Sequence, residues 1–349
     1  MCPRICQIES ILAMRYLGFI LLLGLFSYQP APKFPSKLSD YGLFQGDLKN
    51  HVPNVGVTPY ELTSPLFSDY AHKLRFIQLP AGQSVTYNPD SVFQFPVGTR
   101  IAKTFYYPMD ERNPKGGRRI METRILSHEP SGWVALPYIW NEEQTEAYLE
   151  VAGGTSLVEF KNQQGKKQQV NYVIPNMNQC KGCHERDGIM TPIGPSARQM
   201  NASMRYAHGD ENQLDYWSRS NQMSGVPASR PKFVSYIDES AAINDRVKAY
   251  LDINCAHCHN PKGPAKSSGL FLDYRYYGTT AYGMMKSPVA AGRGSGGLLY
   301  DIVAGKPSES ILHYRMNSQD PGVMMPELGR TIIHQEGVAL IREWIKSIH

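Results

Sequence analysis

The motif Cys-x-x-Cys-His occurs twice in this chain, at residues 180–184 and 255–259. The two copies start 75 residues apart and contain every cysteine beyond residue 6. A disulfide framework would need cysteines outside these motifs, so none is predicted. The fold must therefore be built without disulfides, around two sites where a pair of thiols and an imidazole lie close together.

The spacing within each copy is typical of covalent haem attachment. Two thiols separated by two residues reach the two vinyl groups of one porphyrin, and the histidine that follows becomes the proximal iron ligand. The sequence therefore predicts two covalently bound haem c groups. The predicted attachment residues are Cys180, Cys183, Cys255 and Cys258, with His184 and His259 as iron ligands. Zinc or a redox dithiol is the alternative, because Cys-x-x-Cys pairs also bind zinc.

The N-terminus has the pattern of an export signal. Arg15 precedes an apolar run over residues 16–26, and residues 29–32 then interrupt it with two prolines. We predict that residues 1–31 are a signal peptide, with Met14 as an alternative start. The apolar run is too short for a permanent span, so we expect no stable membrane span after cleavage and a periplasmic protein. A short uncleaved anchor is the alternative.

Composition and charge limit the function classes further. Hydrophobic residues make up 42% of the 349 residues, which is enough to bury a core. The net charge is only +5, and no stretch is dense in lysine and arginine, so we expect no nucleic-acid partner. A weakly basic surface instead suits an acidic periplasmic redox protein as partner.

The chain between residues 60 and 174 has the pattern of a β-rich domain. Short apolar runs alternate with turn signals that contain glycine, proline or asparagine. We predict a small sandwich or curved antiparallel sheet. The predicted strands are residues 91–95, 100–107, 119–126, 133–139, 156–161 and 168–174. Residues 141–149 are predicted to form a brief helix, and residues 212–223 another.

The C-terminal third has helical periodicity instead. Residues 241–253 and 335–348 each place apolar side chains on one face, which predicts a helix at either end of this part. The expected fold class is therefore α+β. The expected domains are residues 32–174, β-rich; residues 175–235, the first haem-binding segment and linker; and residues 236–349, an all-α domain.

The predicted helices, the second motif and a Met-Pro pair at residues 325–326 follow one another in the order found in class I cytochrome c, which residues 236–349 resemble. By that resemblance Met325 is the distal ligand of the second haem. Met324 is the alternative, and Met316 is expected to be a core residue. His257, between the second pair of thiols, is expected to face solvent.

The distal ligand of the first haem has no context as clear as this. Met200 and Met190 are the leading candidates, and an open position is also compatible with the sequence. Residues 191–195 are predicted to form a proline-rich loop over one haem face. The other candidate ligands are Met177, Met204, His72, His128, His208 and Lys103.

Over residues 40–349 the chain resembles a family of exported bacterial dihaem c-type cytochromes. The matching stretches are residues 64–71, 133–138 with 140–143, and 194–201. The resemblance implies periplasmic electron transfer, with electrons accepted from a dehydrogenase or another redox partner. We expect a carrier rather than a catalyst. The alternative is a peroxidase-like dihaem oxidoreductase with an open first haem.

Overall fold

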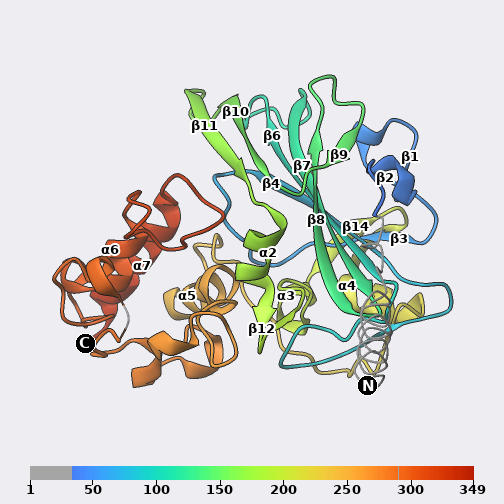
Figure 1. The fold of residues 1–349 in the computed structure, drawn as a ribbon. Coiled ribbons are helices and arrows are strands. Elements are labelled where there is room, and N and C mark those ends of the chain that lie inside the picture. The colour runs from blue at the N-terminus through green and yellow to red at the C-terminus, as the bar shows by residue number, and fades with distance from the viewer. Residues whose placement is uncertain (1–33, 290) are drawn as a thin grey trace, which may run out of the picture. The chain divides into compact units, whose positions relative to one another are not determined.

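Six antiparallel strands form the largest sheet, and the order of the strands across it is β3-β4-β6-β7-β8-β9 (Figure 1). Their bounds are β3 (Val57–Pro59), β4 (His72–Gln78), β6 (Arg100–Pro108), β7 (Arg118–Glu129), β8 (Gly132–Trp140) and β9 (Ala147–Leu149). β6, β7 and β8 confirm three of the predicted strands. They are rich in β-branched and aromatic residues, which pack well on a pleated surface.

The computed structural model describes residues 34–289 and 291–349. Residues 36–349 form one compact unit, and the predicted boundaries after residues 174 and 235 fall inside it. The predicted signal peptide, residues 1–31, lies outside the described residues. Within the described ranges, no helix is long and apolar enough to cross a lipid bilayer.

A separate hairpin follows the sheet. It consists of β10 (Gly154–Lys161) and β11 (Lys167–Ile174), which confirms two further predicted strands. Val158, Phe160 and Tyr172 on this hairpin pack in one apolar cluster with Phe105 and Tyr107 of β6. Burial of side chains of this size contributes about 1.5–3 kcal/mol each.

Two predicted elements are wrong. Residues 91–95 form only isolated bridges, at Val92 and Gln94, because prolines at 89 and 96 restrict this segment. Residues 141–149 form a turn followed by β9 instead of a helix. The side chain of Asn141 closes that turn by accepting hydrogen bonds from the backbone N–H groups of Thr145 and Glu146, at 2.9 and 3.1 Å.

Short elements precede the sheet, interrupt it, or connect it to the C-terminal part. Of these, α4 corresponds to the predicted helix at residues 212–223. The bounds are β1 (Phe44–Gln45), β2 (Val52–Pro53), β5 (Val85–Thr86), α2 (Met177–His184), β12 (Glu185–Arg186), β13 (Ile189–Met190), α3 (Ala197–Met200), β14 (Ser203–Tyr206), β15 (Gly209–Asn212), α4 (Gln213–Arg219) and β16 (Met223–Ser224).

The prediction of an all-α, class I cytochrome c-like domain over residues 236–349 is wrong. The protein is β-rich, with 28% strand and 23% helix. Beyond residue 235 the structure has α5 (Ile243–Leu251), α6 (Ile311–Met316) and α7 (Gln335–Ser347), and the described residues between 257 and 310 contain no α-helix. Nine glycines in that stretch explain the difference, because glycine destabilises helices. The chain there forms loops and short 3-10 turns.

The segment before β4 fixes the C-terminal part against the sheet. The Asp69 carboxylate accepts hydrogen bonds from the backbone N–H groups of Thr331 and Ile332, at 2.7 and 3.0 Å. The ring of Phe67 stacks on that of His334, with centroids 4.1 Å apart. Asp69 has a left-handed φ of 50°, a strained conformation that these contacts hold. The segment before β4 is therefore joined to the segment before α7 by hydrogen bonds and a ring stack.

Candidate haem-binding site

The first motif lies in the last turn of α2, which packs beside β8 (Figure 1). A capping box starts this helix: the Asn176 side chain accepts from the Gln179 N–H at 2.8 Å, and the Gln179 side chain accepts from the Asn176 N–H at 2.9 Å. The two thiols of the motif, on Cys180 and Cys183, are thus presented by a short, capped helix.

His184 ends this helix with its imidazole already oriented. Its Nδ1 donates a hydrogen bond to the Thr191 carbonyl at 2.8 Å, across the β12–β13 hairpin. Nε2 makes no hydrogen bond to any described residue, so it is free to bind a metal. A histidine ligand commonly uses its other N–H in this way to fix the tautomer and the ring orientation.

The second motif has the same design on a different scaffold. α5 continues through a π turn (Asp252–Ala256) into the motif, and His259 Nδ1 donates to the Leu270 carbonyl at 3.3 Å. Asn260 supports the following loop by donating to the Ala256 carbonyl at 2.7 Å and accepting from the Lys262 N–H at 2.8 Å. Each motif therefore supplies two thiols and one oriented imidazole.

Burial lowers the pKa of both motif histidines. The pKa of His184 and that of His259 each fall to about 4, and hydrogen bonds from the rings to backbone carbonyls oppose the shift only in part. Both imidazoles are therefore neutral at pH 7, and the neutral form is the one that binds a metal.

Cavities adjoin both motifs. A cavity of about 450 Å³ is lined by both thiols of the second motif, by His259 and by Met316 and Met325. Cavities of about 150 and 400 Å³ flank the first motif, and Cys183, Pro192 and Ile193 line both of them. The largest lies within the usual range for cofactor sites, about 300–1,000 Å³. The donor set of each motif fits covalent haem attachment. The cavity that His259 lines lies in the usual volume range, whereas the one that His184 lines is smaller.

The two motifs meet in space although 75 residues separate them in sequence. Cys183 Sγ, a ring nitrogen of His257 and Cys258 Sγ all lie within 4.8 Å of one another. The Cys258 thiol also donates to the Gly182 carbonyl at 3.7 Å. The hydrogen bond between the thiols lowers the pKa of Cys183 and raises that of Cys258. The second cysteine of each motif therefore marks their contact.

His257, expected to face solvent, is only partly exposed. Its ring reaches into the contact between the motifs, where its Nδ1 is buried and has no hydrogen-bond partner among the described residues. This follows from the packing of the first motif against the second, which the local sequence does not reveal.

The zinc alternative gains three grouped ligands, Cys183, His257 and Cys258. A structural zinc site takes four ligands in a tetrahedron. Cys180 and Cys255, the first cysteine of each motif, lie outside this group of three. The group leaves those two thiols unexplained, whereas haem attachment uses all four.

Met325, the predicted distal ligand of the second haem, lines the cavities beside both motif histidines. It lines the 450 Å³ cavity together with His259, whereas Met324 is buried and does not line that cavity. The guanidinium of Arg330 donates to the carbonyls of Met325 and Ser318, each at 2.9 Å, and so holds the Met325 loop in place. Met316, the expected core residue, belongs to the C-terminal apolar cluster and also lines this cavity. The assignment of Met325 stays a prediction.

Neither candidate for the first distal ligand lines the 150 Å³ cavity beside His184. Met200 is fully buried in the apolar cluster around Trp217, and Met190 lies in β13, next to the Thr191 carbonyl that binds His184. Both assignments stay predictions without a supporting contact. Of the six alternatives, Lys103 alone lines this cavity.

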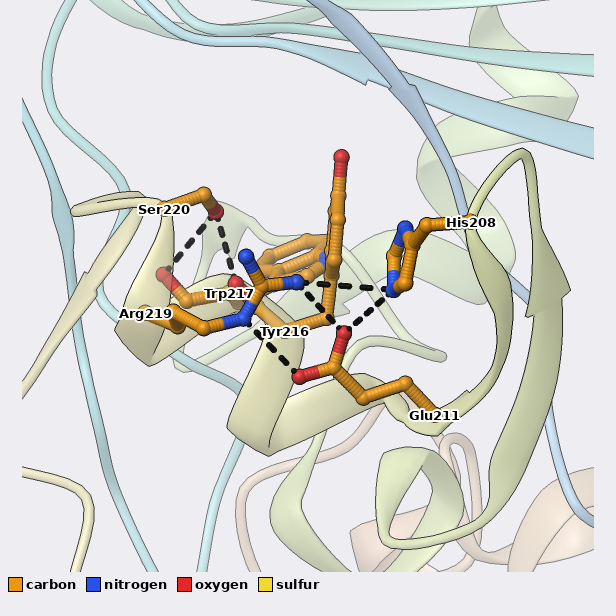
Figure 2. A network of polar contacts seen from close by, with 6 residues as sticks. All are labelled: His208, Glu211, Tyr216, Trp217, Arg219 and Ser220. Atoms are coloured by element: carbon orange, nitrogen blue, oxygen red, sulfur yellow. Dashed lines mark hydrogen bonds and ion pairs between the residues drawn. The ribbon is translucent and has the colours of Figure 1, made fainter.

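His208, another of the alternative ligands, does not line the cavity beside His184, because its side chain is held by other contacts. Figure 2 shows Glu211 accepting hydrogen bonds from His208 Nε2 and from Arg219 Nη2, each at 2.7 Å. The His208 ring also stacks on that of Tyr216, with centroids 5.7 Å apart. The imidazole is thus part of a surface network that ties β15 to α4.

Sequence reasoning missed a group of basic side chains beside the first motif. Arg75, Arg124 and Arg330 line the same cavity as His184, along with Lys103. The sequence did contain a signal for this group, because charged residues at 103 and 124 interrupt the apolar side of two predicted strands.

No family model, no curated protein and no solved structure matches this chain.

Proposed function

We propose that the chain is a dihaem electron carrier, with one haem attached through Cys180 and Cys183 and the other through Cys255 and Cys258. Haem iron, when bound, accepts or donates one electron. The proposal is supported by two thiol pairs, each followed by a histidine whose Nδ1 is held by a backbone carbonyl. We further propose export to the periplasm, and a periplasmic dehydrogenase or another redox protein as partner.

The contact between the motifs is the observation that carries this proposal. Porphyrins attached at Cys183 and at Cys258 would have their thioether edges next to each other, since the two sulfur atoms lie within 4.8 Å. Electrons could then pass directly between the haems, with His257 packed beside the shared edge. A chain with two independent functions would have no reason to bring these two cysteines together.

The remaining residues of the site orient the ligands and exclude water. Thr191 and Leu270 hold the proximal imidazoles through their carbonyls. Pro192 and Ile193 line the cavities at the first motif, in the loop predicted to cover a haem face. Apolar walls of this kind limit solvent access, which tunes the reduction potential of a haem.

A peroxidase-like dihaem oxidoreductase is the second candidate function. One observation favours it: neither Met190 nor Met200 lines the cavity beside His184, and the methionines that do, Met316 and Met325, also line the cavity of His259. In that function the first haem keeps an open sixth position, and the second haem supplies electrons to it across the contact between the motifs.

The test is to purify the protein from cells with an intact haem-ligation system. We expect the mass of the mature chain to increase by two haem groups, and zinc to be absent. Electron paramagnetic resonance of the ferric protein should show magnetic interaction between two haems as near as the motif contact implies. A single haem adduct, or stoichiometric zinc, would contradict the proposal. A high-spin signal that shifts on adding peroxide would instead select the second candidate.

Replacing Met325 with alanine should lower the reduction potential of the second haem, because thioether ligation raises the potential. A redox titration followed by absorbance measures it. The matched control is Met324→Leu, since Met324 is adjacent but does not line the cavity. If Met316→Leu lowers the potential and Met325→Ala does not, Met316 is the ligand and the assignment of Met325 is wrong.

A further inference from the structure

Three neighbouring strands of the sheet place three cations in one row. Arg75 of β4 lies directly opposite Lys103 of β6, and Lys103 lies directly opposite Arg124 of β7. Directly paired residues project from the same face of a sheet, with Cβ atoms about 5 Å apart. Like charges in this arrangement repel each other, so the row needs compensation from another group.

The cation row faces the first motif. Its three side chains line the 150 Å³ cavity that Cys180, Cys183 and His184 also line. The next residues on the same face, Ile101 and Leu126, line the cavity too, so the sheet forms a continuous wall.

Two members of the row have unused hydrogen-bond donors. Arg75 is only 8% exposed, and its Nη2 is buried without a partner among the described residues. Lys103 Nζ lies 4.8 Å from the centroid of the Phe105 ring and makes no hydrogen bond within the described part of the chain. A buried donor without a partner costs free energy, and a guanidinium costs more than a neutral group. A missing acceptor would satisfy both side chains.

The protein's own carboxylates neutralise only one described member of the row, Arg124. Glu122 pairs with Arg124 at 2.5 Å, and its other contact is the Tyr172 hydroxyl. Asp69 is engaged by the backbone of Thr331 and Ile332. A fourth cation, Lys73, packs over the same Phe105 ring, at 5.8 Å. Burial, followed by the charges of neighbouring lysines and arginines, lowers the pKa of both lysines, as expected where positive charge is in excess.

We propose that Arg75, Lys103 and Arg124 form an anion-binding site beside the first motif, for a carboxylate or a small oxyanion. Arg75 offers its unpaired Nη2 donor and Lys103 a point charge, whereas Arg124, whose Nε and Nη2 already donate to Glu122, adds positive charge nearby. The anion has two sources. It is a propionate of the first haem, or a free anion that enters the cavity. The site itself does not depend on haem, whereas the propionate source rests on the proposed function.

The test compares Lys103→Gln and Arg75→Gln with Lys167→Gln, an exposed lysine on β11. Calorimetry with sulfate, which does not bind haem iron, measures the affinity of the purified protein for a free anion. If the anion is free, sulfate should bind the wild type and the control equally. Each row variant should then bind it about tenfold more weakly, as the loss of one charge-assisted hydrogen bond predicts.

If a propionate fills the site, sulfate should not bind the wild type. Each row variant should then lower the reduction potential of the first haem, since a cation at a propionate favours the reduced, less positive haem. Lys167→Gln should leave that potential unchanged. Potentials and sulfate binding both unchanged in the row variants would overturn the proposal.

A low-spin first haem that turns high-spin in Lys103→Gln would also overturn it, since Lys103 would then be a neutral iron ligand. If the purified protein contains no haem but binds sulfate through these residues, the anion site is supported and only the proposed function is refuted.

Discussion

Replacing Cys183 with alanine is expected to reduce the haem content from two groups per chain to one. Cys183 supplies one of the two thioethers of the first motif, and its sulfur lies within 4.8 Å of Cys258 Sγ. Loss of the first haem should also remove the magnetic interaction, so the remaining ferric haem should give the spectrum of an isolated centre. Haem content is measured by pyridine haemochrome absorbance and mass, and the interaction by electron paramagnetic resonance.

The matched control for this variant is Lys181→Ala. Lys181 lies between the two cysteines of the same motif, but 54% of its side chain is exposed. Among the described residues its one ion pair is a long contact with Glu185, at 3.9 Å. It should keep both haems. The reciprocal variant Cys258→Ala should lose the second haem and keep the first. If Cys183→Ala instead loses zinc while its absorbance is unchanged, the group of Cys183, His257 and Cys258 is a zinc site and the haem proposal fails.

The motifs could be predicted from the sequence because attachment chemistry depends on local spacing. Two thiols and an imidazole within five residues need no information about the rest of the fold. The strands over residues 100–107, 119–126 and 133–139 and the helices α5 and α7 were also predictable, since each carries its own apolar pattern. Local signals therefore located the ligands and most of the elements that present them.

The contact between the motifs could not be predicted in the same way. It depends on how the segment before β4 holds the C-terminal part, through Asp69 with Thr331 and Phe67 with His334. These residues are more than 260 positions apart, and no periodic pattern links them. The two helices at the ends of residues 236–349 suggested an all-α domain, but the glycine-rich stretch between them does not form helix.

The cation row was hidden for a related reason. Arg75, Lys103 and Arg124 are ordinary charged residues in three separate strands, and only the register of β4, β6 and β7 aligns them. A shift of one residue would move a member to the other face. There Thr104, Thr123 and His51 form a chain of hydrogen bonds, at 2.7 and 3.0 Å. Register follows from tertiary packing, so the excess charge becomes visible only in the folded chain.

Substituting Glu122 with glutamine is expected to lower the free energy of unfolding by about 3–5 kcal/mol. Glu122 is 0% exposed and holds Arg124 through two hydrogen bonds, at 2.5 and 2.8 Å, with a third from the Tyr172 hydroxyl at 2.6 Å. Glutamine keeps the shape but removes the charge. Arg124 then lies uncompensated beside Lys103, and breaking a buried pair in this way costs far more than losing a surface ion pair.

Urea unfolding of the purified protein, followed by circular dichroism, measures this loss. The matched control is Glu159→Gln on β10, an exposed carboxylate whose contact is Gln169, at 3.0 Å; it should change stability by less than about 0.5 kcal/mol. The double variant Glu122→Gln with Arg124→Gln should recover part of the stability, because it removes the uncompensated cation. A loss below about 1 kcal/mol in Glu122→Gln would mean that Arg124 is neutralised by another group. Added sulfate should reduce the loss if a free anion occupies the cation row, since the anion then takes over part of the role of the carboxylate.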